Sequence, residues 1–114
     1  MDVNRNCIEP GEALKDTYFG YTLSLIGGKH KMIIIYLIAQ NDNNIRFNEL
    51  HRQMGGVSYR ALSLALKELS ASGIVARREY PQVPPKVEYS LTEKGLSLLP
   101  IMDALCRWGR DHRE

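Results

Sequence analysis

The apolar and polar positions of this 114-residue chain follow two rhythms, one typical of helices and one typical of strands. In the stretch from Ser58 to Gly73, Leu62, Leu66 and Leu69 recur at helical spacing and therefore share one face. Ser58 is suited to cap the start of a helix, and Gly73 is suited to end it. The stretch therefore predicts an amphipathic helix whose opposite face is polar and basic.

A second, shorter helix is predicted just upstream, over residues 47–54, after a very short strand at 45–46. The glycine pair Gly55 and Gly56 makes the turn between this helix and the longer one. Two short helices joined by a glycine turn follow the plan of a helix-turn-helix unit, in which the second helix reads DNA.

The upstream part of the chain predicts two further helices, over residues 12–26 and 29–40. The first is amphipathic and is expected to break near Gly20. The second contains a run at 32–39 that is apolar on nearly all sides, so periodicity cannot distinguish a central strand from a buried helix. We favour the helix, because twelve residues is long for a strand.

After Gly73 the pattern changes to a period of two over residues 74–80 and again over 86–91. A proline-rich connection joins these segments, which predicts a β-hairpin placed like the wing of a winged helix-turn-helix protein. Arg77, Arg78 and Lys86 lie on this hairpin and are candidates to contact phosphate or the minor groove.

The last predicted helix spans residues 92–110, with Thr92 as its cap and a kink at Pro100. Its apolar face comprises Leu96, Leu99, Met102, Leu105, Cys106 and Trp108. This face either folds back on its own chain or forms a homodimer interface. We favour the dimer, because an exposed tryptophan and leucine stripe is unusual on a monomer.

The predicted fold class is mainly α with a small β-hairpin: a winged helix-turn-helix with added N- and C-terminal dimerisation helices. A flexible tail (1–11) precedes a single domain (12–114). No apolar run approaches the length of a membrane span, and the first ten residues lack the order of a signal peptide, so we expect a cytoplasmic protein without a membrane partner.

The charge of the chain is concentrated where the helix-turn-helix is predicted. The net charge is only +2, but residues 29–92 carry nine basic and five acidic side chains. A local basic surface suits a phosphate backbone. Arg60, Ser63 and Lys67 share the outer face of the predicted reading helix, and Tyr59 lies in its first turn. The alternative is that these charges are solvated or form surface ion pairs that contribute little.

The sequence predicts no metal site, no cofactor and no catalysis. The two cysteines, Cys7 and Cys106, lie near opposite ends without metal-ligand spacing, and the three histidines match no metal motif. Paired acid–base carboxylates, a nucleophile elbow and a phosphate loop are absent from the sequence. The two function classes that remain are a DNA-binding regulator and a winged-helix module that binds protein instead.

The order of these parts resembles the HxlR family of bacterial winged helix-turn-helix transcription regulators. The similarity covers roughly residues 23–109 and rests on these motifs: LIGGK at 25–29, RFNEL at 46–50, VSYRALSLALKEL at 57–69, SGIVARREYPQVPPKVEYSLTEKG at 72–95, and Trp108-Gly109. The resemblance implies a dimeric regulator, expected to be a repressor, that binds an inverted repeat in double-stranded DNA. By position it places Ser58, Tyr59, Arg60, Ser63 and Lys67 in or beside the recognition helix, Arg77, Arg78 and Lys86 in the wing, and Arg46 near backbone phosphate.

Two departures and two cysteines complete the comparison. His30 stands where the family usually has tryptophan, and Leu64 falls on the outer face of the recognition helix, where it either contacts a thymine methyl or indicates a rotated helix. Some relatives sense oxidants through an N-terminal cysteine, so Cys7 is a candidate redox sensor, with an inert thiol as the alternative. Cys106 is expected to be buried. A small-molecule effector between the apolar helices remains open.

Overall fold

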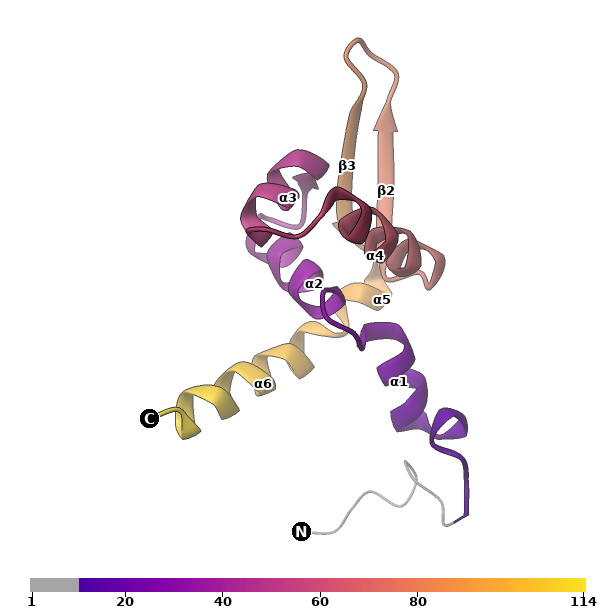
Figure 1. The fold of residues 1–114 in the computed structure, drawn as a ribbon, viewed down its shortest axis with the longest axis vertical. Helices are drawn as coiled ribbons and strands as arrows, with labels where there is room; N and C mark the ends of the chain where they lie inside the picture. The colour runs from indigo at the N-terminus through magenta and orange to yellow at the C-terminus, as the bar shows by residue number, and fades with distance from the viewer. Residues whose placement is uncertain (1–10) are drawn as a thin grey trace.

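The computed structural model describes residues 11–114, and Figure 1 shows a compact body with a hairpin on one side and two helical arms on the other. In chain order the elements are η1 (Leu14–Asp16), α1 (Tyr18–Ile26), α2 (Lys31–Gln40), β1 (Ile45–Arg46), α3 (Phe47–Met54), α4 (Tyr59–Ala71), β2 (Val75–Tyr80), β3 (Lys86–Leu91), α5 (Glu93–Leu96) and α6 (Leu99–His112). The predicted winged helix-turn-helix fold is confirmed.

The core lies where α2, α3 and α4 meet the base of the sheet. Its fully buried large side chains are Ile34, Ile35, Ile38, Leu50, Leu62, Leu66, Leu69 and Ile74. Three of these belong to α2, so the apolar run at 32–39 is a helix rather than a strand. The helix is not buried on all sides, since Ile33 and Tyr36 are exposed. Packing of its inner face overrides the weak helix preference of consecutive isoleucines.

The sheet has three antiparallel strands in the order β1-β3-β2. The wing hairpin pairs Val75 with Leu91 at its base and Tyr80 with Lys86 near its tip. The two-residue strand β1 pairs Ile45 with Tyr89. This pairing fixes the base of the wing to the start of α3, a long-range contact that the period-two pattern did not indicate.

Both predicted ends of α4 are confirmed. The Ser58 hydroxyl accepts a hydrogen bond from the Ala61 amide at 3.0 Å. Gly73 adopts a φ of +78°, and the Ile74 amide donates to the Leu69 carbonyl at 3.0 Å. This pattern is a Schellman motif, which satisfies carbonyls that the end of a helix would otherwise leave unpaired.

Two predicted helices are wrong in detail. The first breaks at Thr17 and not at Gly20, because Thr17 caps α1 by accepting from the Gly20 amide at 2.9 Å. The last divides into α5 and α6 and is not one kinked helix. Pro100 lies in the first turn of α6, where its missing N–H costs nothing, so it helps to start a helix and does not bend one.

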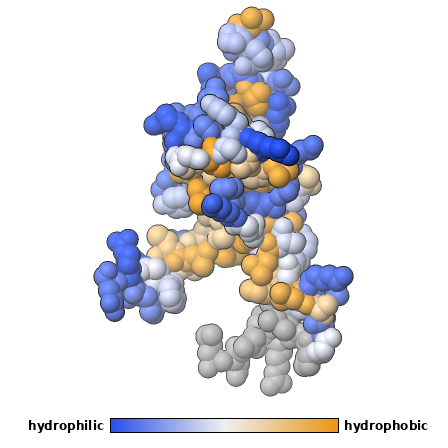
Figure 2. Space-filling model, in the orientation of Figure 1, coloured by the Kyte–Doolittle hydropathy of each residue, from blue (hydrophilic) through white to orange (hydrophobic). Residues whose placement is uncertain are grey.

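Helices α1 and α6 project from the body as two arms (Figure 1). The radius of gyration is 16.2 Å, whereas a compact domain of this length would have about 13 Å. Figure 2 shows apolar residues gathered over α1 and over the part of α6 nearest the body. Trp108 and Leu105 of α6 are 64% and 54% exposed, and Tyr18 of α1 is 73% exposed. Within residues 11–114, both predicted interface helices therefore carry exposed apolar side chains.

Lys94 connects the arm α1 to the end of α4. Its ammonium group donates to the Ser72 carbonyl at 2.9 Å and to the Tyr21 hydroxyl at 3.3 Å.

Within residues 11–114 no single helix is long and apolar enough to cross a membrane, and α1 and α2 reach that length only as a pair bent by 69°.

Candidate nucleic-acid interface

The outer face of α4 carries the side chains that the sequence assigned to it. Arg60, Ser63, Leu64 and Lys67 are all exposed and lie three or four residues apart, so they form one row. In the described part of the chain, neither Arg60 nor Lys67 forms an ion pair. The α4 surface therefore presents two uncommitted cations.

Leu64 is 56% exposed and lies in the middle of this row. The buried face of α4 is made by Leu62, Ala65, Leu66 and Leu69, as the spacing predicted, so the helix is not rotated from its expected orientation. An apolar side chain that the core does not need is therefore available at the centre of the candidate interface.

The three basic residues of the wing do not share one face. Arg77 pairs across the hairpin with Tyr89, on the face that turns toward α4, whereas Arg78 pairs with Glu88 on the opposite face. Successive residues of a strand point to opposite sides of the sheet, so the sequence already contained this division. The prediction treated the three cations as one group.

A crevice of about 280 Å³ separates α4 from the wing. It is lined by Ser63, Leu66, Lys67, Ser70, Arg77 and Tyr89. The Tyr89 hydroxyl accepts from the Arg77 guanidinium and, together with Glu79, holds the pKa of Arg77 above its ordinary value. The crevice thus brings a cation from the recognition helix and one from the wing to the same groove.

The other face of the wing is organised around Tyr80. The Arg78 guanidinium lies 5.0 Å and the Lys86 ammonium 4.7 Å from the centre of the Tyr80 ring. Beneath them Glu88 is only 9% exposed and pairs with Lys86 at 3.4 Å. A hydrogen bond from Asn44, with others from Tyr80 and Lys86, lowers the pKa of Glu88. This carboxylate anchors the wing and offsets part of its positive charge.

Arg46 is a third cation on that side of the sheet, beside the exposed Arg78 and the half-buried Lys86. It immediately precedes α3, and its Cα pairs with that of Glu88, which in turn pairs with Arg78. Arg46 therefore extends the basic surface from the wing to the N-terminus of α3, where a helix end also attracts anions.

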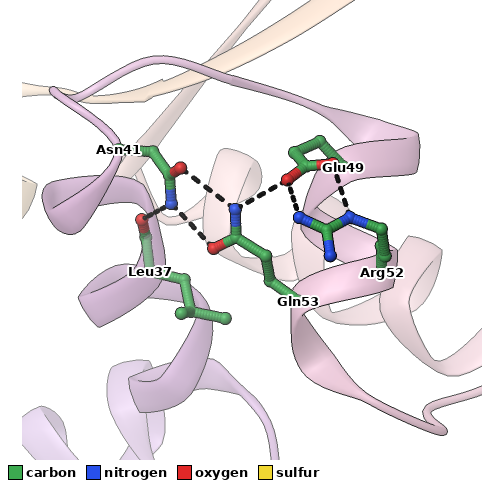
Figure 3. A network of polar contacts seen from close by, with 5 residues as sticks. All are labelled: Leu37, Asn41, Glu49, Arg52 and Gln53. Atoms are coloured by element: carbon green, nitrogen blue, oxygen red, sulfur yellow. Dashed lines mark hydrogen bonds and ion pairs between the residues drawn. The ribbon is translucent and has the colours of Figure 1, made fainter.

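A polar network fixes α3 against α2, as Figure 3 shows. The side-chain amides of Asn41 and Gln53 donate to each other at 2.9 and 3.0 Å, and Asn41 also donates to the Leu37 carbonyl at 2.7 Å. Gln53 donates to Glu49 at 3.0 Å. Hydrogen bonds from Arg52 and then Gln53 lower the pKa of Glu49 to about 2. The network holds the first helix of the pair in one orientation beneath α4.

The predicted interface residues of the last helix divide into two groups. Leu99 and Met102 pack against the core of their own chain, whereas Leu96, Leu105 and Trp108 are exposed. Cys106 is exposed, so the expectation of a buried thiol was wrong for the single chain, because α6 points away from the body. Further exposed apolar residues, which the prediction did not name as interface residues, are Leu14, Tyr18, Phe19, Tyr21, Leu23, Ile33, Tyr36 and Ile101, together with Val83 in the connection of the wing.

The remaining sequence predictions concern metals and Cys7. In the described residues no group of three His, Cys, Asp or Glu side chains could hold a metal ion. Cys7 lies outside the described residues. His30 is half-buried and has no side-chain role in capping α2.

Known proteins that are similar to this chain in sequence and fold are helix-turn-helix transcriptional regulators. The model of a family described as HxlR-like helix-turn-helix matches residues 25–114. The HTH-type transcriptional regulator BH0655 of Halalkalibacterium halodurans is 66% identical over 96 residues, which cover 84% of each chain.

Solved structures similar to this chain are also regulators. The redox regulator HypR in its reduced form superimposes with a TM-score of 0.80 at 47% identity, covering 86% of this chain and 95% of that chain. Its oxidised form gives 0.75 at 49% identity, covering 82% and 95%. The reduced transcriptional regulator YodB from B. subtilis gives 0.73 at 32% identity, covering 85% and 93%.

Proposed function

Because this chain belongs to the HxlR-like helix-turn-helix family, we propose that it regulates transcription by binding a specific DNA sequence through α4 and the wing. The observation that carries this proposal is the row of exposed residues on α4, in which Arg60 and Lys67 have no ion-pair partner within residues 11–114. Cations held without counter-charges are suited to phosphates and base edges.

Each candidate residue has a role that follows from its place. Arg60, in the first turn of α4, donates two hydrogen bonds to a guanine edge in the major groove. Leu64 meets a thymine methyl. Lys67 and Arg77 bind the phosphate that passes between α4 and the wing, while Arg46 binds phosphate beside α3. Ser58 and Ser63 complete the α4 contacts, and Arg78 and Lys86 act on the outer side of the wing.

The test is selection from a random duplex library at several salt concentrations. We expect one sequence to be enriched, and we expect Arg60→Ala to relax the preference at one base pair by a factor of roughly 5 to 150. Arg113→Ala is the matched control, because it removes the same charge at the far end of α6. Failure of the parent to enrich any sequence at low salt would refute the proposal.

We further propose that the regulator is a homodimer whose arms, α1 and α6, form the interface. Two-fold symmetry then requires an inverted-repeat operator with half-sites about 34–36 Å apart, one turn of DNA. Leu105 and Leu64 provide a matched test, since they are 54% and 56% exposed on α6 and α4. Leu105→Asp should yield monomers in sedimentation, whereas Leu64→Asp should leave the dimer intact and weaken DNA binding. Dimerisation unaffected by Leu105→Asp would place the interface elsewhere.

We also propose a thiol-dependent response, supported by the similarity to HypR, which is described as a redox regulator and is known in oxidised and reduced forms. Cys7 remains the predicted sensor, and Cys106 is the exposed second thiol. Oxidant should change operator binding of the parent but not of Cys7→Ser. We further propose that the protein acts as a repressor in the cytoplasm and needs no cofactor or catalytic activity for this role.

A further inference from the structure

The start of the recognition helix is held by an aromatic stack that connects it to α3. Tyr59 is the first residue of α4, and its ring centre lies 3.9 Å from that of His51, with an angle of 8° between the planes. Phe47, one turn before His51 on α3, lies 6.0 Å from Tyr59 at 17°. One side of Tyr59 is therefore covered, although the residue remains 60% exposed.

His51 is itself fixed by a second contact. Its Nε2 atom lies 2.8 Å from the carbonyl oxygen of Val57, in the turn that precedes α4. A carbonyl can only accept, so Nε2 carries the proton and donates. The imidazole of His51 thus hydrogen-bonds to the backbone of the turn through Nε2 and stacks on the ring of Tyr59.

We propose that His51 is a positioning residue that presents Tyr59 to a base edge, an inference that rests on the proposed function. Without the stack, the Tyr59 side chain would sample several rotamers, and binding would have to restrict them at a cost in entropy. With the stack, the ring is already ordered. In the described part of the chain no hydrogen bond holds the Tyr59 hydroxyl, so that group and the exposed part of the side chain remain for DNA.

This arrangement distinguishes Tyr59 from its neighbour Arg60. Arg60 is exposed, and within residues 11–114 it forms no ion pair or ring contact with α3. The long Arg60 side chain can adopt several conformations to reach a base or phosphate. The Tyr59 ring is held flat against α3, so it contacts only bases whose edges fit its fixed position. The specificity of the first turn therefore depends partly on a residue outside the recognition helix.

A double-mutant cycle tests the proposal. His51→Ala should weaken binding to the selected operator by roughly three- to tenfold, the range expected for an aromatic pair. In a Tyr59→Ala background the same change should cost nothing further. His51→Phe, which keeps a flat ring but loses the bond to Val57, should retain most of the affinity. Gln53→Ala is the matched control on α3, and its effect should add to that of Tyr59→Ala.

Two further readouts separate positioning from a general structural role. Library selection with His51→Ala should lose preference at the same base pair as Tyr59→Ala. In the DNA-free protein, His51→Ala should shift the NMR signals of the Tyr59 ring protons, which stacking places in the ring current of the imidazole. Additive losses in the cycle, or unchanged Tyr59 signals, would overturn the proposal. If the parent selects no sequence, the proposed function fails, and the ring signals still show whether His51 orders Tyr59.

Discussion

Gly95 occupies a position where the structure leaves no room for a side chain. A Cβ atom built there would lie 2.3 Å from the carbonyl oxygen of Ile74 and 3.2 Å from Cβ of Leu91. Real Cβ atoms essentially never approach another heavy atom within 3.0 Å, so the backbone would have to move by about 0.7 Å. The obstacle is itself fixed, because the Ile74 carbonyl accepts from the Thr92 amide at 3.1 Å.

Gly95→Ala should therefore destabilise the chain by about 2 kcal/mol. Forcing an extra carbon into a packed site costs about 1–3 kcal/mol, and a strained hydrogen bond adds about 1 kcal/mol. The higher helix propensity of alanine returns up to about 1 kcal/mol. For a domain of this size the expected loss lowers Tm by roughly 8 °C.

The measurement is urea and thermal unfolding of the two variants Gly95→Ala and Gly109→Ala at one protein concentration, since dimerisation would shift the midpoints. Gly109 lies inside α6, and outside the backbone of its own helix nothing in residues 11–114 comes within 4 Å of a Cβ added there. That variant should gain about 0.5–1 kcal/mol. The reasoning is refuted if Gly95→Ala stays within about 0.5 kcal/mol of the parent.

Three further outcomes follow from the geometry. Lys67→Ala and Arg77→Ala should each reduce the slope of log K against log salt by about 0.9, measured by titration of the operator, and an unchanged slope would exclude a phosphate contact for that residue. Because the pKa of Glu49 falls from 4.5 to about 2 on folding, its contribution to stability is complete above about pH 4.5 and is lost as the pH falls toward 2. Glu49→Gln should flatten the acid-unfolding curve in that window, and a curve identical to the parent's would contradict this. Ser58→Ala should cost about 1 kcal/mol in urea unfolding by removing the cap of α4, whereas Ser63→Ala, an exposed serine inside the same helix, should change stability little.

The helix-turn-helix could be predicted because its signals are local. The Ser58 cap, the Gly73 terminus and the leucines between them determine α4 without reference to the rest of the chain. The period-two pattern predicted the hairpin for the same reason, and residues 45–46 did form the short strand.

The parts that could not be predicted depend on contacts distant in sequence or on competing local choices. The sequence indicated a break in the first helix near Gly20, whereas the helix α1 begins after Thr17, whose side chain accepts from the Gly20 amide. Gly20 itself packs closely against the Leu14 carbonyl, a contact that no periodicity indicates. Pro100 starts a helix or bends one according to where the chain turns before it. The stack of His51 on Tyr59 joins two helices across a turn, which no periodicity reveals.

The candidate site was predicted in composition but not in arrangement. Sequence placed Arg77, Arg78 and Lys86 together, whereas the pleat of the strand sends Arg77 toward α4 and its neighbours to the other side. Glu88 and Gln53, which support this surface, were not predicted because each has a partner distant in sequence: Asn44 donates to Glu88, and Asn41 and Gln53 donate to each other.

Lys94 links the arm α1 to the end of the reading helix α4 within a single chain. Its ammonium group holds the last turn of α4 through the Ser72 carbonyl and holds α1 through Tyr21. One side chain therefore contacts both α1 and the end of α4 within the single chain. In the homodimer proposed above, the arms form the interface, so Lys94 lies on the path between that interface and the reading helix of each chain.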